Sequence, residues 1–140
     1  MIARVSQYIA AALTLALSTA CTQGTATGSS WQDKFDLAAC NLQPTGRGEY
    51  FVLEPGFQLV LEGGGVKLEI TVLNETKRID GVDTRVVEER EWKGGKLYEV
   101  ARNYFAICEK TKDVFYFGED VDFYEDGKVV KTDFHINRVD

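Results

Sequence analysis

The chain has 140 residues, of which 44% are hydrophobic and 27% are charged, and its formal net charge is −6. This composition is typical of one globular domain, too polar for an integral membrane protein and too apolar for a disordered chain. The excess of acids argues against nucleic acid as a partner, because phosphate binding needs clustered lysine and arginine. His135 is the only histidine, so catalytic sites that need two histidines are excluded.

Residues 1–21 have the pattern of a secretory leader. Arg4 gives a short positive start, an uncharged stretch of twelve residues runs from Ile9 to Ala20, and small residues precede Cys21. This stretch is shorter than the roughly 20 apolar residues that a transmembrane helix needs. Removing the leader takes away Arg4 and no acid, so the net charge changes from −6 to −7, which suits an exported domain held away from anionic lipid.

The end of the leader resembles a bacterial lipobox, in which a cysteine becomes the lipidated first residue of the mature chain. Ala20-Cys21 fits this pattern, although Ser18 stands where a lipobox usually has leucine and Leu17 lies one place further back. We expect lipidation of Cys21 and anchoring to a membrane. The alternative is an ordinary signal peptide cleaved after Ala20. Residues 22–47 follow as a flexible tether and an irregular N-terminal segment.

Two cysteines remain beyond the lipobox, Cys40 and Cys108. In a chain exported to an oxidising compartment, such a pair predicts a disulfide that fixes the irregular segment to a central strand. The alternative is two buried free thiols, because cysteine is among the most buried residue types. A catalytic cysteine is not expected, since His135 is the only histidine available as a base.

Residues 48–140 are expected to form strands joined by short turns. Val66–Val72 alternates apolar and polar residues with a period of two, which indicates a strand with one solvated face. Turn signals follow at Asp80-Gly81, Gly94-Gly95 and Asp126-Gly127. The sequence therefore predicts an all-β fold: an antiparallel meander of six to eight strands in a curled sheet, barrel or sandwich.

The most apolar strand of the mature chain carries a run of aromatic residues. Alternation predicts that Phe115, Phe117 and Phe123 point to one face of the sheet, and that Tyr116 and Tyr124 point to the other. Phenylalanines in the core with tyrosines at the rim are typical of a packed sheet. A tyrosine-lined surface for a sugar or a peptide is the alternative.

Several of these strands resemble an uncharacterised family of exported bacterial proteins, some of them lipoproteins. The matching runs are Glu54–Gly63, Leu73–Lys77, Asp80–Glu91 and, most closely, Arg102–Cys108 (with NYFAIC) and Val114–Asp122 (with VFYFGEDVD). The resemblance covers about residues 49–130 and implies a secreted or envelope location, but no activity and no catalytic residues. Similar proteins continue beyond Gly127-Lys128 with a glycine-rich apolar segment, so we expect either a shortened member or a fragment.

The acids that end the aromatic strand form the first candidate site. Asp120 and Asp122 share one face with Tyr124, and Glu119 projects from the other. Paired carboxylates suit a hard cation such as calcium or a polar ligand, although the spacing does not match the helical calcium-binding loop. The alternative is a solvated strand end whose acids prevent aggregation.

The second candidate is the run Glu88–Glu91, in which Glu89 and Glu91 share one face. Two carboxylates are the minimum for glycoside hydrolysis. The alternative explanation is cross-strand pairing of these acids with basic side chains, namely Arg102, Lys93 or Lys96.

The sequence as a whole favours an exported, lipid-anchored domain of the cell envelope with a non-catalytic binding or structural role and no cofactor. Its partner would be the membrane through the anchor, together with a small molecule, a polysaccharide or an envelope protein. One alternative is a lipocalin-like carrier of an apolar ligand, since a curled sheet often encloses a cavity. The other is a carboxylate-dependent hydrolase.

Overall fold

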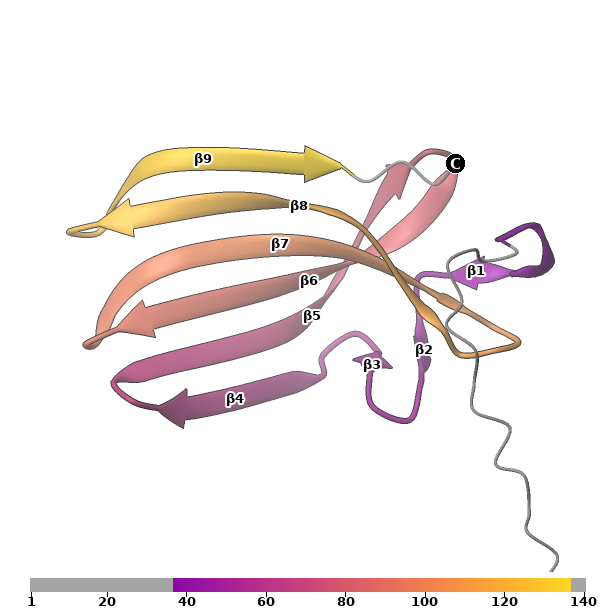
Figure 1. Cartoon of the computed structure of the whole chain (residues 1–140), viewed down its shortest axis with the longest axis horizontal. Coiled ribbons are helices and arrows are strands. Elements are labelled where there is room, and N and C mark those ends of the chain that lie inside the picture. The colour runs from indigo at the N-terminus through magenta and orange to yellow at the C-terminus, as the bar shows by residue number, and fades with distance from the viewer. Residues whose placement is uncertain (1–36, 137–140) are drawn as a thin grey trace, which may run out of the picture. The chain divides into compact units, whose positions relative to one another are not determined.

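The computed structural model describes residues 37–136. Six long strands follow one another both along the chain and across the sheet, which is curled but not closed into a barrel (Figure 1). The predicted all-β antiparallel meander is confirmed. The long strands are β4 (Gln58–Gly63), β5 (Val66–Ile79), β6 (Val82–Lys93), β7 (Lys96–Cys108), β8 (Val114–Glu125) and β9 (Lys128–Ile136).

Three strands of two residues precede the meander. After a 3-10 turn, η1 (Leu37–Ala39), strand β1 (Leu42–Gln43) pairs with β7, and β2 (Gly46–Arg47) pairs with β3 (Val52–Leu53). The described part of the segment 22–47 therefore contains two short strands. The predicted leader, Cys21 and the beginning of the predicted tether lie outside the described residues.

Turns of two residues connect most of the long strands. At Asp80-Gly81 and at Asp126-Gly127, both residues have positive φ: 46° and 81° at the first turn, and 46° and 77° at the second. This conformation matches the right-handed twist of a hairpin and favours Asp-Gly and Gly-Gly sequences. The turn signals read from the sequence are therefore confirmed at these positions and at Gly94-Gly95.

The sheet curls around one of its faces, the inner face, which carries Glu88, Arg102 and Asp120. Lys77 of β5 donates hydrogen bonds to the Tyr104 hydroxyl at 3.0 Å and to Asp120 of β8 at 3.1 Å. Two strands lie between β5 and β8, and in a flat sheet three strand spacings would separate their backbones by roughly 14 Å. A lysine side chain does not span that distance, so β5 bends over the inner face.

A buried arginine stabilises this bend. The pairing of β5 with β6 shifts register partway along β5, and such a bulge leaves backbone carbonyls without partners in the ladder. The Arg85 guanidinium donates to the carbonyl oxygens of Leu73 and Glu75, at 3.3 Å each, and to that of Pro44 at 2.8 Å. Burial lowers the pKa of Arg85. Arg85 thereby joins the bulge to the loop between β1 and β2.

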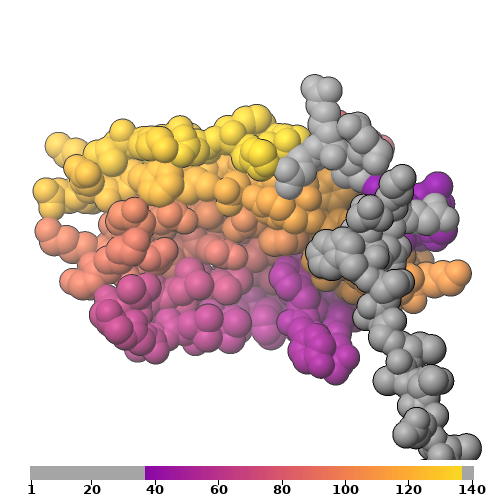
Figure 2. Space-filling view, viewed as in Figure 1, coloured from indigo at the N-terminus to yellow at the C-terminus, as the bar shows by residue number. Residues whose placement is uncertain are grey.

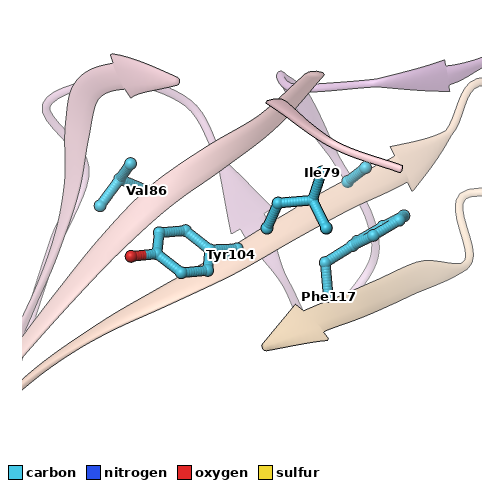
Figure 3. Packing of buried hydrophobic residues seen from close by; sticks show 5 residues of the cluster. Ile79, Val86, Tyr104 and Phe117 are labelled. Carbon is cyan, nitrogen blue, oxygen red and sulfur yellow. The ribbon is translucent and has the colours of Figure 1, made fainter. Parts of the chain in front are cut away.

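Apolar side chains from four strands meet on the inner face where β5 bends. Ile79, Val86, Tyr104 and Phe117 are each 6% exposed or less, and they point toward one another in Figure 3. Ile136 of β9 packs against the same cluster. This inner cluster therefore joins the β5–β6 hairpin to the last strand of the sheet.

The opposite face, the outer face, is covered at one end by the segment that contains β2 and β3. Leu53 of β3 is fully buried and packs with Val72, Val87 and Ile107. The Phe51 and Phe105 rings extend this contact, because their centroids lie 5.1 Å apart. Apolar packing therefore holds the N-terminal segment against the sheet.

A covalent bond fixes the same segment at a second point. Cys40 forms a disulfide with Cys108 at the end of β7, and Leu42 of β1 pairs with Cys108 in the sheet. The predicted disulfide is confirmed, together with the attachment of the N-terminal segment to a central strand.

The expected alternation of the aromatic residues on β8 is wrong for Phe123 and for Tyr124, because Tyr124 lies on the inner face with Asp120 and Asp122 whereas Tyr116 lies on the outer face with Phe105. The register between β7 and β8 shifts by one residue along the pairing, and a shift of one residue turns every later side chain to the other face. Phe115 and Phe117 lie in the inner cluster, whereas Phe123 lies on the outer face opposite Glu99, its ring centroid 6.1 Å from that of Tyr98.

Gly118 makes the shift on β8 possible. It has a φ of 126°, and a Cβ atom built on it would lie 2.1 Å from the carbonyl oxygen of His135 on β9. Only glycine adopts this backbone conformation freely, and only glycine lets β9 approach so closely. The bulge is therefore encoded by one residue of the sequence.

Strands β4 and β9 form the two borders of the sheet (Figure 2). All six residues of β4 are exposed, and all residues of β9 except Ile136 are exposed. Natural sheets protect such borders with charged side chains, and β9 carries Lys128 and Lys131 while β4 carries Glu62. Among residues 37–136, β4 pairs only with β5 and β9 only with β8, so no described strand covers either border.

Candidate functional site

Polar side chains form two parallel rows across the inner face, away from the apolar cluster. In one row, Glu88 of β6 is opposite Arg102 of β7, which is opposite Asp120 of β8. The second row lies two residues along each strand and runs Arg90, Val100, Asp122 and Thr132. Because residues two apart on a strand share a face, both rows lie on the concave side of the sheet.

A hollow of about 410 Å³ lies over these rows. Such a volume is within the usual range for small-molecule sites. Of the larger depressions, one of about 600 Å³ lies at the ends of β4, β5 and β6 near their turns, and one of about 580 Å³ lies between the segment 37–44 and the β5–β6 turn. The hollow on the inner face, which we call the inner hollow, is lined by Glu88, Arg90, Val100, Arg102, Asp120, Asp122, Tyr124 and Thr132.

One nearly buried carboxylate holds two arginines in the inner hollow. The Glu88 side chain is 10% exposed, and its two oxygens accept hydrogen bonds from the Nε atoms of Arg90, at 2.7 Å, and Arg102, at 3.2 Å. The hydrogen bond to Glu88 raises the pKa of Arg102. The expected cross-strand pairing of the Glu88–Glu91 acids with basic side chains is confirmed for Glu88 with Arg102, whereas Glu91 pairs with Lys93 of its own strand at 3.1 Å.

Asp120 belongs to a network that joins the inner hollow to the inner cluster. Its carboxylate accepts hydrogen bonds from the Tyr104 hydroxyl and, at 3.1 Å, from Lys77. Burial raises the pKa of Tyr104, and the hydrogen bond to Asp120 raises it further. Burial alone would lower the pKa of Lys77, but its hydrogen bonds to Tyr104 and Asp120 raise it. The position of Asp120 is therefore fixed from two strands.

Asp122 has a simpler partner, and Glu119 is separate from both aspartates. The Thr132 hydroxyl donates to Asp122 at 2.6 Å. Glu119 pairs with Asn103 in the sheet, which places its side chain on the outer face, as the alternation predicts. Within residues 37–136, no three His, Cys, Asp or Glu side chains are grouped as a metal site would require. The structure therefore brings Asp120 and Asp122 together in the inner hollow and leaves Glu119 apart.

Glu119 instead belongs to a group of acids on the outer face. Burial raises the pKa of Glu89, and the charges of Glu119 and Glu99 raise it further. Burial, followed by the charge of Glu119, also raises the pKa of Tyr116, to about 12. Burial likewise raises the pKa of Glu99. Ionisation of Glu89 and of Glu99 therefore opposes folding.

We expect Glu89→Gln to stabilise the protein at pH 7 by roughly 0.2–1 kcal/mol, the size of a like-charge pair across strands. The pKa of Glu89 is higher in the folded chain than its ordinary value of 4.5. Ionisation of Glu89 therefore lowers the free energy of unfolding as the pH rises through the pKa that Glu89 has in the folded chain. Below pH 4.5, where Glu89 is protonated in both the folded and the unfolded chain, this loss is absent. Urea unfolding at pH 7 and pH 3.5 measures the effect, and the gain should appear only at pH 7. An equal gain at both pH values would contradict it, and Glu125→Gln at an exposed position is the control.

The sequence identifies all three acids of the inner hollow as candidates but does not show that they form one site. Glu88 was assigned to ion pairing and Asp120 with Asp122 to a separate strand end, whereas the fold places all three in one depression. Arg90, Lys77 and Thr132 were not singled out. The available signal was the recurrence of charged residues at intervals of two on three successive strands, since such residues share one face.

Comparison of the chain with protein-family models, with curated proteins and with solved structures finds no match. In the part of the chain that the structure describes, no helix is long and apolar enough to cross a membrane. The fold and the inner hollow are thus the observations on which a function can be argued.

Proposed function

We propose that the chain is an exported module of a bacterial cell envelope, tethered through a lipid on Cys21, with a binding role and no catalytic one. The Cys40–Cys108 disulfide carries this proposal. Disulfides persist in oxidising compartments outside the cytosol, and residues 1–21 have the composition of a secretory leader. The resemblance to exported bacterial proteins supports the same location.

The inner hollow supports binding of a polar ligand such as a small molecule or a polysaccharide. Its lining is charged or hydroxylated except for Val100, which does not favour the apolar ligand of a lipocalin-like carrier. Each of its carboxylates already accepts a hydrogen bond: Glu88 from two arginines, Asp120 from Lys77 and Tyr104, and Asp122 from Thr132. Hydrolysis by paired carboxylates needs one that gives up a proton, so these fixed pairs favour binding.

Fractionation of bacteria that express the full chain tests the tether. The wild type should sediment with membranes, and Cys21→Ala should release it into the soluble fraction, because an acyl chain contributes about 0.8 kcal/mol per buried methylene. Mass spectrometry of the mature N-terminus should find an acylated Cys21. A soluble wild type, or a Cys21→Ala variant that still sediments, would contradict the anchor.

A second readout tests export separately from anchoring. A variant without residues 1–21 should remain in the cytosol with Cys40 and Cys108 reduced, so that alkylation after unfolding modifies both thiols, since Cys108 is buried in the folded protein. The same thiols in the full chain should be protected by the disulfide. Alkylation of both thiols in the full chain would count against export to an oxidising compartment.

A further inference from the structure

We infer that the inner hollow binds an acidic sugar, whose carboxylate lies between Arg90 and Arg102. This inference rests on the proposed binding role and names the ligand class for that site. Three observations support the inference. They are the guanidinium atoms that Arg90 and Arg102 leave available for a ligand, the polar side chains on the other side of the hollow, and the balance of charges inside it.

Arg90 and Arg102 are oriented by a shared partner. Each donates to Glu88 through its Nε atom, and the Glu88 side chain is only 10% exposed. The two arginines lie diagonally across neighbouring strands, since Arg90 is opposite Val100 and Arg102 is opposite Glu88. Cα atoms of diagonal neighbours are about 7 to 8 Å apart, so both guanidinium groups reach one small anion.

The terminal amino groups of both arginines remain for a ligand. Guanidinium has five N–H donors, and among residues 37–136 the hydrogen bonds of Arg90 and Arg102 are made through Nε alone. Their side chains are 44% and 51% exposed and line the inner hollow. A planar fork of donors held in this way matches a carboxylate.

The other side of the inner hollow suits hydroxyl groups. Asp122 and Thr132 form a hydrogen-bonded pair that can still accept hydrogen bonds, and the Tyr124 side chain lines the hollow beside them. A small anion without a hydroxylated ring, such as inorganic phosphate, would bind the arginines without reaching across to this polar wall. A sugar that carries a carboxylate uses both.

The charge balance limits the ligand to a single or weakly charged anion. The three acids Glu88, Asp120 and Asp122 are balanced by Arg90 and Arg102 together with Lys77, which is hydrogen bonded to Asp120. The whole chain has a net charge of −6, which repels densely charged polymers at long range. A sugar with one carboxylate per unit has a low charge density. It therefore suits a site whose own charges are balanced, and the acidic chain repels it only weakly.

Titration of the isotopically labelled mature chain with D-glucuronate, D-glucose and inorganic phosphate tests the inference. We expect D-glucuronate to shift the NMR signals of the Arg90 and Arg102 Nε–H groups and to bind at least tenfold more tightly than D-glucose. Arg102→Gln should weaken D-glucuronate binding about tenfold or more, as expected for loss of a hydrogen bond to a charged group. Arg102→Lys should keep only part of the affinity, because a point charge replaces the fork.

Arg78→Gln is the matched control, because Arg78 pairs with Asp83 at 2.8 Å on the exposed surface, away from the inner hollow. It should leave D-glucuronate binding unchanged, and near-UV circular dichroism checks that each variant folds. Equal binding of D-glucose, tighter binding of phosphate, or an Arg102→Gln variant with wild-type affinity would overturn the inference. Absence of binding to all three probes would also overturn it. The membrane anchor on Cys21 is tested separately by fractionation, so the two proposals can fail independently.

Discussion

The double substitution Cys40→Ala/Cys108→Ala is expected to lower the free energy of unfolding by about 4 kcal/mol, on the basis of the chain entropy of the loop that the disulfide closes. The two cysteines are 68 residues apart, so the bond removes many conformations from the unfolded chain. The bond also holds the segment before β1 against β7, where Cys108 is fully buried. Urea unfolding of the mature protein, with the slope and the midpoint compared to the wild type, measures the loss.

Reduction of the wild type under the same conditions provides the control. It breaks the bond without removing a sulfur atom from the core, so it should reproduce most of the loss that the double variant shows. A loss below about 1 kcal/mol in both experiments would contradict the entropic account, because packing of Leu53 and Phe51 alone would then hold the N-terminal segment.

Phe117→Ala is expected to lower the free energy of unfolding by about 3 to 5 kcal/mol, the usual effect of removing a large buried ring. Phe117 is fully buried and contacts side chains from β5, β6 and β7 in the inner cluster. The cavity that remains cannot collapse easily, because the β5–β6 hairpin is fixed by Arg85 to the loop after β1. Thermal and urea unfolding both measure the effect.

Phe134→Ala serves as the matched control for this substitution. The Phe134 ring is 66% exposed, so its removal should change stability by no more than about 0.5 kcal/mol. Similar losses for the two variants would show that the inner cluster does not dominate the stability of the sheet.

The alternating strands and the two-residue turns made the meander predictable from sequence. Asp80-Gly81, Gly94-Gly95 and Asp126-Gly127 all favour backbone with positive φ, and each ends one long strand and begins the next. Cys40 and Cys108 were predictable as a pair because the leader indicated an oxidising compartment. The residue types at the turns and the presence of two cysteines were therefore sufficient to predict the hairpins and the disulfide.

The inner hollow was not predictable, because it depends on bulges. Counting back from the Gly94-Gly95 turn with strict pairing places Glu88 opposite Ala101, whereas the register shift between Glu91 and Trp92 places it opposite Arg102. One extra residue thus decides whether an acid meets an arginine or a methyl group. Gly118 was the one visible sign of such a shift, and its role becomes clear only when β9 lies against it.

The burial of Glu88 also depends on the fold rather than on the local sequence. Glu88 is 8% exposed, since the bend of β5 encloses the inner face on which it lies. Burial of a carboxylate is tolerated when cations and donors satisfy it, and here Arg90 and Arg102 do so. The partners of Glu88 come from two strands, and a single-strand pattern does not reveal them.

The position of β1 has a consequence for the order in which the chain acquires its structure. Each long strand pairs with the strands next to it in sequence. Strand β1 instead pairs with β7, whose residues are synthesised much later, so this pairing cannot form early. Successive hairpins can form one after another as the chain is synthesised, because their contacts are local in sequence. The N-terminal segment can pair only after β7 has been completed. Oxidation of the Cys40 and Cys108 thiols to the disulfide, which passes two electrons to an external thiol oxidant, is then the last step, and it locks a sheet that has already formed.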